Sequence, residues 1–191
     1  MSPDQANRRG RHTRAMLRDA LADLVVERGL DTVTVGEISE RARVTRTAFY
    51  RHYRDKQHLV DQILAEATAH LAPGPRRDTI ETAQCLRRFF DHVAEDEKLF
   101  RALLGPRGSP SFTAGLQAAF VSLNTCVTAA PRAADGLTLA VLGAMLTQTT
   151  LWWLDNDRPI PSADLAARYL VMVNAVRARA AGVEHVPGVS T

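Results

Sequence analysis

The sequence of 191 residues has few cysteines, few aromatic side chains and no long uninterrupted apolar run. Its two cysteines, Cys85 and Cys126, are isolated and lack CxxC spacing, which argues against a disulfide framework or a zinc site. No window holds the roughly 18 consecutive apolar residues of a membrane span, and the first residues, MSPDQANRRGRHTRAM, contain no apolar segment typical of a signal peptide. The composition therefore predicts a cytoplasmic protein that does not bind membranes.

Strand signals are also scarce. The only alternation of apolar and polar residues is short, at Thr32 to Val35, and no Asn-Gly or Asp-Gly turn separates two alternating runs. Helical spacing is common instead, beginning with Leu17, Leu21 and Leu24 before a stop signal at Gly29. We therefore predict an all-α protein of about nine helices.

Positive charge is concentrated near the N-terminus. The whole chain has a net charge of +3, whereas residues 1–60 hold 12 Lys and Arg against 8 Asp and Glu, a local charge of +4. A basic segment joined to a nearly neutral remainder indicates a module that faces a polyanion such as nucleic acid. A merely solvated arginine-rich segment would show the same charge.

Two short helices are predicted between Thr34 and Tyr53. Thr34 can cap the first helix with Glu37 three residues later, and Thr45 can cap the second. Two short helices joined by a tight turn form a helix-turn-helix, whose second helix fits the major groove of DNA.

The second of these helices supplies candidates for two kinds of DNA contact. Side chains at its start can reach base edges, with Arg46 suited to a bidentate contact to guanine and Ala48 to a thymine methyl. Side chains further on are hydrogen-bond donors for phosphate oxygens. The base-reading candidates are Thr45, Arg46, Thr47 and Ala48, and the phosphate candidates are Tyr50, His52 and Lys56.

The stretch TVTVGEISERARVTRTAFYRHYRDKQHLVDQIL, preceded by ALADLVVERGLD, resembles the DNA-binding domain of the TetR family of bacterial transcription regulators. The residues that carry this resemblance are Gly29, Thr34, Ala42, Val44, Tyr50, Lys56 and Leu59. The resemblance implies that Thr34 and Val35 meet the DNA backbone. It also implies that the chain departs from the family at Arg43, where the turn usually carries glycine, and at Gly36, which has no side chain to read a base.

The domain organisation follows from these motifs. We expect a flexible basic arm at 1–12, a three-helix helix-turn-helix DNA-binding domain at 13–60, an effector-binding and dimerisation domain at 61–183, and a flexible tail at 184–191. The resemblance implies a homodimeric repressor that binds a double-stranded DNA operator and is released by an unknown small-molecule effector, without enzymatic activity or a cofactor.

The C-terminal two-thirds give weaker signals. The segment GLTLAVLGAMLTQTTLWWL is apolar around most of its circumference, which favours burial on two sides and hence dimerisation. Candidate dimer residues are Leu142, Met145, Trp152, Tyr169, Met172, Val173 and Val176, and candidate effector-binding residues are His92, Phe100, Phe120, Gln148 and Trp152. The polar residues of this segment, including Thr147 and Thr150, have the alternative of bonding back to their own helix.

Two other functions fit parts of the sequence. Asp91, His92 and Glu95 share one helical face, as the ligands of a metal-binding protein or helical enzyme would. They equally fit an exposed helix end, where acidic residues favour the start of the next helix. The two cysteines would suit a redox sensor, but they lack cations placed to activate a thiol.

Overall fold

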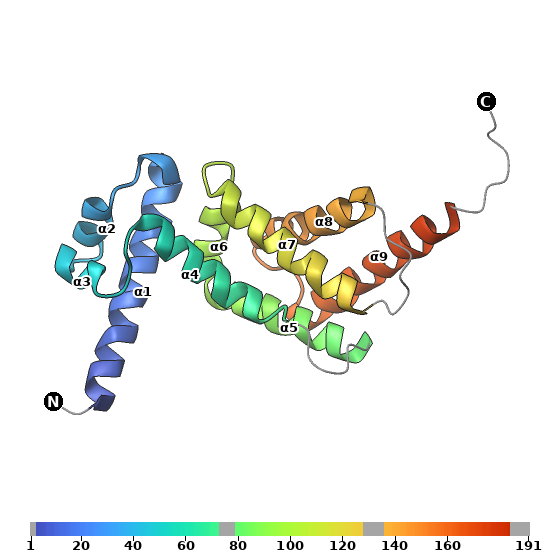
Figure 1. Cartoon of the computed structure of the whole chain (residues 1–191), viewed down its shortest axis with the longest axis horizontal. Helices are drawn as coiled ribbons and strands as arrows, with labels where there is room; N and C mark the ends of the chain where they lie inside the picture. Colours follow the sequence, from blue (N-terminus) through green and yellow to red (C-terminus); the bar gives the residue numbers. More distant parts are fainter. Residues whose placement is uncertain (1–2, 73–78, 128–135, 184–191) are drawn as a thin grey trace. The chain divides into compact units, whose positions relative to one another are not determined.

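The computed structural model describes residues 3–72, 79–127 and 136–183 and contains, within these ranges, nine α-helices, one short 3-10 helix and no strand. The all-α prediction is therefore confirmed. In chain order the elements are α1 (Pro3–Arg28), η1 (Leu30–Thr32), α2 (Val35–Arg41), α3 (Arg46–Tyr50), α4 (Lys56–Ala69), α5 (Thr79–Glu95), α6 (Glu97–Leu104), α7 (Pro110–Val127), α8 (Gly136–Asp155) and α9 (Ser162–Val183) (Figure 1). The expected tail at 184–191 lies outside the described residues.

The chain forms two compact units. Unit 1 comprises residues 1–66 and 96–113, and unit 2 comprises residues 67–95 and 114–191. The boundary expected after residue 60 thus falls several residues later, inside α4. The expectation of one continuous domain at 61–183 also differs from the structure, because residues 96–113 return to the first unit.

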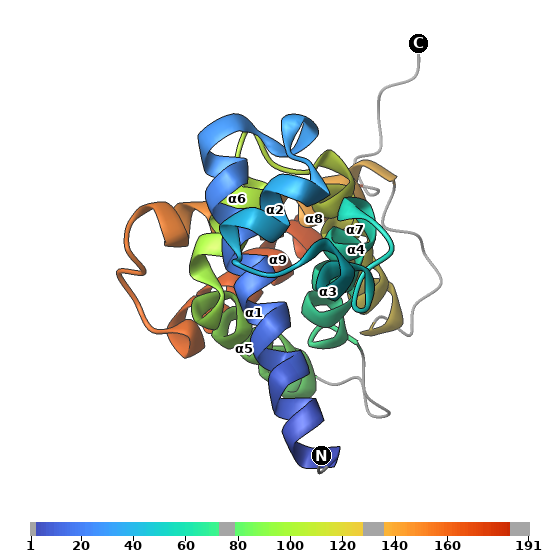
Figure 2. The same cartoon turned by 90° about the vertical axis from the view of Figure 1, so that its left-hand side faces the viewer.

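The core of unit 1 is built on the apolar stripe of α1. Leu17, Leu21 and Val25 are fully buried, and Phe49 of α3 is buried among the same elements. Both views show α2 lying against α1 (Figure 1 and Figure 2). Helix α1 ends where the sequence predicted, because Gly29 takes a φ of 84°, a conformation that glycine adopts without strain.

The segment that returns to unit 1 is held by α6 and the loop after it. Lys98 of α6 forms an ion pair with Asp23 of α1 at 2.5 Å, and the Leu30 amide donates to the Arg107 carbonyl at 2.9 Å. Phe100 and Phe112 pack edge to face with ring centroids 5.9 Å apart. The first two contacts join residues about 75 positions apart, a separation for which local sequence patterns carry no signal.

Helix α1 starts earlier than the sequence indicated. It begins at Pro3, so residues 3–12 are helical and not the flexible arm that we expected. Proline favours the first turn of a helix because its missing N–H has no partner there. The arginines of this segment are therefore carried on a regular helix.

The core of unit 2 is rich in aromatic rings. Phe90 packs edge to face against Trp153 at 5.8 Å and against Tyr169 at 6.3 Å, and Phe120 packs against Tyr169 at 5.3 Å. The Trp153 indole N–H donates to the Ile160 carbonyl at 2.8 Å, which ties the end of α8 to the turn before α9. Helices α5, α8 and α9 thereby share one packed interior.

Helix α8 is long and apolar enough, by length and composition alone, to cross a membrane. Several of its residues are nevertheless buried within unit 2, as in the core helix of a folded domain. Two of its threonines bond back to their own helix: Thr147 donates to the Ala144 carbonyl at 3.0 Å and Thr150 to the Leu146 carbonyl at 2.8 Å. For Thr147 and Thr150 the structure therefore shows the alternative in which the side chain bonds back to its own helix.

Candidate nucleic-acid interface

The first helix of the motif is fixed by a reciprocal cap. The Glu37 amide donates to Thr34 Oγ1 at 3.3 Å, and the Thr34 amide donates to Glu37 Oε2 at 2.9 Å. The Thr34 amide and hydroxyl, which both donate to the Glu37 carboxylate, and the nearby Arg28 guanidinium hold the pKa of the Glu37 carboxyl below its usual value. The predicted capping box is confirmed, and it leaves Thr34 exposed at the surface.

The turn of the motif contains the departure from glycine seen in the sequence. Arg43 has a φ of 53°, in the left-handed region that costs a residue with a side chain roughly 1–2 kcal/mol. Two backbone bonds close the turn nonetheless, from Arg43 N to Glu40 O at 3.0 Å and from Val44 N to Ser39 O at 2.9 Å. The turn therefore forms with Arg43 where the family usually carries glycine, and the Arg43 side chain is exposed.

The second helix, α3, presents its first turn to solvent. Thr45 Oγ1 accepts a hydrogen bond from the Ala48 amide at 3.1 Å, so the hydroxyl oxygen is already used as a cap. Arg46 and Thr47 are exposed, Ala48 is half-buried and Phe49 faces the core. The predicted base-reading set is thus brought together at one tip, with Arg46 and Thr47 the most accessible.

Gly36 was noted in the sequence only for its missing side chain. A Cβ built on Gly36 would lie 2.5 Å from Arg46 Nη2, 3.2 Å from Cζ and 3.3 Å from Nε. The guanidinium of Arg46 therefore occupies the space that any other residue at position 36 would fill. The sequence showed only that Gly36 has no side chain to contact a base. The fold adds that Gly36 lies next to the guanidinium of Arg46, the candidate for a contact to guanine.

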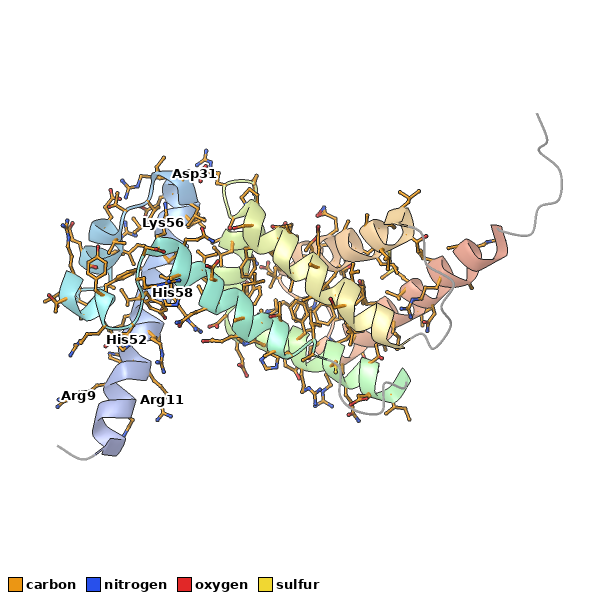
Figure 3. All side chains as sticks on the ribbon, viewed as in Figure 1. Arg9, Arg11, Asp31, His52, Lys56 and His58 are labelled. Carbon is orange, nitrogen blue, oxygen red and sulfur yellow. The ribbon has the colours of Figure 1, made fainter. Side chains whose placement is uncertain are left out.

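Lys56 differs from the phosphate contact that we expected. Its Nζ donates to three backbone carbonyls, those of Leu30 at 2.5 Å, Asp31 at 3.2 Å and Val33 at 2.8 Å (Figure 3). An ammonium has only three N–H donors, so a phosphate would have to replace one of these partners. In this structure Lys56 fastens the segment between α1 and α2.

His52 and Tyr50 remain beside the tip of α3. Tyr50 is 57% exposed and packs edge to face on Phe49, with ring centroids 5.6 Å apart. His52 lies next to α1, because a Cβ on Gly10 would be 3.6 Å from its Cε1. Burial, together with the Arg14 and Arg51 charges, lowers the pKa of the His52 imidazole, so that it is neutral over a wider pH range.

The helical N-terminus of α1 adds cations next to this surface. Figure 3 shows Arg9 and Arg11 projecting from different sides of α1, in the part of the helix that runs on beyond His52. No acidic residue occurs between Arg8 and Arg18. Sequence reasoning assigned this charge to a flexible arm, and the signal that could have corrected it is the starting proline at position 3.

Other cations of unit 1 are neutralised by acids. Arg41 pairs with Glu27 through two hydrogen bonds of 2.8 and 2.9 Å, and Arg28 pairs with Glu37 at 2.8 Å. In contrast, no hydrogen bond or ion pair of the Arg46 guanidinium occurs within the described part of the chain. Unpaired positive charge is therefore presented at the tip of α3.

The structure does not bring the five predicted effector-binding residues together. Phe100 belongs to unit 1, Phe120 is buried in unit 2 against Tyr169, and Gln148 and Trp152 are exposed. Unit 2 has two open depressions of about 450 and 350 Å³, at the α8 to α9 turn and between α5 and α9, and neither is lined by any of the five. Helical spacing in the sequence could not show which of these side chains would face a common interior.

The predicted dimer residues divide into two groups. Leu142, Tyr169 and Val173 are buried within the chain's own core, so those three predictions are wrong as surface contacts. Trp152 at 50% and Met172 at 43% are exposed, and Met145 and Val176 are half-buried. Among the side chains that the structure describes on the two helices, the exposed large apolar ones are Leu137, Val141 and Trp152 on α8 and Val171 and Met172 on α9.

Two residues of the alternative metal-binding or catalytic cluster, Asp91 and His92, make contacts with other side chains. Asp91 accepts a hydrogen bond from the Ser162 hydroxyl at the start of α9, and the His92 ring stacks on His70 with centroids 4.7 Å apart. Within the described residues, no three His, Cys, Asp or Glu side chains are grouped where they could hold a metal ion. Cys85 is buried, and the side chain of Cys126 lies outside the described residues.

Comparison with known proteins gives matches over both parts of the chain. Residues 17–63 match the family model described as bacterial regulatory proteins, tetR family. The chain is 28% identical over 179 residues to the HTH-type transcriptional activator FasR of Mycolicibacterium smegmatis, covering 83% of this chain and 82% of that protein.

Two solved structures extend the likeness in fold. A tetR-family transcriptional regulator from Streptomyces coelicolor matches with a TM-score of 0.63 and 22% identity, over 88% of this chain and 84% of that one. The regulator FadR of Bacillus subtilis, solved in complex with stearoyl-CoA, matches with a TM-score of 0.56 and 14% identity, over 83% of this chain and 96% of that one. These likenesses extend beyond the helix-turn-helix to the helices of unit 2.

Proposed function

Because this chain belongs to the TetR family of bacterial transcription regulators, we propose that it binds a double-stranded DNA operator as a homodimer and acts as a repressor. The observation that carries the proposal is the exposed first turn of α3, where Arg46 has no acidic partner within the described residues. A cation placed on a helix that fits the major groove can donate two hydrogen bonds to guanine.

The side chains around this tip divide into two roles. Arg46 and Thr47 would contact base edges in the major groove, and Thr45 and Ala48 would lie on either side of them. Phosphate contacts would come from Tyr50 and His52, from Thr34 and Val35 at the start of α2, and from the arginines of α1. Lys56 would hold the segment between α1 and α2 in place and would not contact DNA, because its ammonium already bonds to backbone carbonyls of that segment.

The first experiment is selection of bound sequences from randomised duplexes with the full chain, followed by affinity measurements over a range of salt concentrations. We expect enrichment of a sequence with two similar half-sites, because each half-site would meet one protomer. Affinity should fall steeply with salt, since each phosphate contact releases counterions. A chain that enriches no sequence and shows no salt-dependent binding would contradict the proposal.

Dimerisation is supported by the apolar side chains left exposed on α8 and α9. Leu137 and Val141 lie one turn apart on α8, and Val171 and Met172 adjoin on α9. Large apolar groups grouped on a surface are typical of an interaction site. A four-helix interface built from α8 and α9 of two copies would cover them.

Regulation by a small molecule is the remaining part of the proposal. FadR is recorded with stearoyl-CoA, which makes stearoyl-CoA the first probe to test on this chain. A ligand releases DNA only if it binds the two states of the protein with different affinity. We expect a lower affinity of the dimer for its selected duplex in the presence of the effector.

The sign of regulation needs its own test. FasR is named an activator, whereas we propose repression by a cytoplasmic protein. A reporter gene placed behind the selected operator, with and without the regulator, distinguishes the two outcomes. Lower expression with the regulator supports repression, and higher expression overturns it.

A further inference from the structure

We propose that Gly36 is a positioning residue that sets the base preference of Arg46 by leaving space for its guanidinium. This inference rests on the proposed DNA-binding function and goes beyond it, because it assigns specificity to a residue with no side chain. Gly36 is the second residue of α2 and Arg46 the first residue of α3, so the two helices of the motif meet at this pair.

The geometry shows how closely the two residues fit. The Cβ position of Gly36 lies 2.5 Å from Arg46 Nη2, whereas carbon and nitrogen atoms that are not bonded keep about 3.5 Å apart. The Cζ and Nε atoms, at 3.2 and 3.3 Å, are also within contact distance. Any residue other than glycine would therefore push the guanidinium away from the start of α2 by about 1 Å.

The guanidinium of Arg46 is positioned by packing against Gly36 and not by a salt bridge. Arg28 and Arg41 each bond to a carboxylate, which uses part of their donor capacity. The guanidinium of Arg46 makes no such bond within the described residues, so its fork of N–H groups is available to a base. Packing on Gly36 restricts the side chain before DNA arrives, which reduces the ordering cost on binding.

A displaced fork would lose part of its selectivity. A bidentate contact requires both N–H groups to align with guanine O6 and N7, and one such contact discriminates against the wrong base by about 5- to 150-fold. A displacement of about 1 Å would weaken one of the two bonds without removing the charge. The effect of a residue at position 36 should therefore appear as reduced preference, with overall DNA affinity less affected.

The test compares four full-length proteins: wild type, G36A, R46A and the double variant. Sequences are first selected from randomised duplexes with wild type, and binding is then measured with duplexes that differ at one position of the half-site. We expect R46A to lose preference for guanine at one position by about 5- to 150-fold. G36A should lose about 3- to 10-fold at the same position, and the double variant should equal R46A.

Two further variants keep this test decisive. G10A adds the same methyl to another helical glycine, where it would meet only His52 Cε1 at an ordinary 3.6 Å, so it should leave base preference unchanged. G36S carries the same Cβ as G36A and replaces it should G36A not fold. Thermal unfolding of each variant establishes that a folded protein is compared.

Three results would overturn the inference. One is a G36A protein with the base preference of wild type. Another is a shift caused by G36A that persists in the R46A background, since the new methyl group would then act by itself. The third is a wild type that reads sequence without any contribution from Arg46. Failure of the proposed function looks different, because wild type would then enrich no sequence at all.

Discussion

Removing the Lys56 ammonium should lower the stability of unit 1 while leaving the salt dependence of DNA binding nearly unchanged. The most informative change is Lys56→Met, which keeps an apolar stem of similar length. In the structure the ammonium donates to the carbonyls of Leu30, Asp31 and Val33, and the bonds to Leu30 and Val33 are partly buried. Removal therefore leaves carbonyl groups without their partner in the segment between α1 and α2.

The size of the effect follows from those three bonds. A hydrogen bond to a charged group contributes about 1.5–3 kcal/mol when buried, and less where water can take its place. The bond to Asp31 is exposed and counts little, so the two partly buried bonds give about 2–3 kcal/mol in total. For a chain of this size that loss lowers the Tm by about 5–10 °C.

Two measurements distinguish this role from a phosphate contact. Thermal unfolding gives the stability change, and the slope of log affinity against log salt, measured well below the Tm, counts phosphate contacts. A phosphate contact at Lys56 would lower that slope by about 1 and leave the Tm unchanged. That pair of results would refute the assignment drawn from the structure.

The chain provides a matched control in its only other lysine, Lys98. Lys98 pairs with Asp23 at 2.5 Å, but its side chain is 55% exposed, and exposed pairs contribute less than about 1 kcal/mol. Lys98→Met should therefore change the Tm by much less than Lys56→Met. Equal losses would mean that removing either lysine acts through net charge and not through the carbonyl bonds.

Further predictions concern the turn, the cap and the dimer. Arg43→Gly should stabilise the protein by about 0.5–1 kcal/mol in chemical unfolding, because relief of left-handed strain exceeds the greater freedom of glycine in the unfolded chain, whereas Arg43→Ala should not stabilise it. Because bonds to Thr34 lower the pKa of Glu37 in the folded state, its carboxylate contributes stability above the unfolded pKa near 4.5 that is lost as the pH falls through the lower folded value. Glu37→Gln should make stability less dependent on pH in that acid range, and an unchanged pH profile would contradict the assignment. Trp152→Glu should dissociate the proposed dimer in sedimentation experiments, while a similar change at buried Leu142 should unfold the chain instead.

Much of the helix-turn-helix could be predicted because its signals are local. The Thr34 cap involves Glu37 only three residues away, and the stop at Gly29 depends on the backbone freedom of one residue. The turn at Arg43 was located in the same way, from the position where the family usually carries glycine. Each of these features is decided within about one helical turn, where residue type and spacing act directly.

Predictions that depended on distant partners were less successful. Lys56 was expected to face phosphate, yet its ammonium bonds to carbonyls about 25 residues earlier in the chain. Leu142 was expected at a dimer surface and is buried by its own chain. Apolar character shows that a side chain avoids water, but it does not show which neighbour covers it.

The sequence by itself determined the helical class, the end of α1 at Gly29 and the start of α3 at Thr45, because caps, turns and apolar spacing act between near neighbours. Tertiary structure alone decided that residues 96–113 join the first unit, that the Lys56 ammonium bonds to backbone carbonyls and that the Arg46 guanidinium lies over Gly36. Those outcomes depend on contacts between residues far apart in the chain, or on the angle at which two helices meet. Local preferences do not encode either of them.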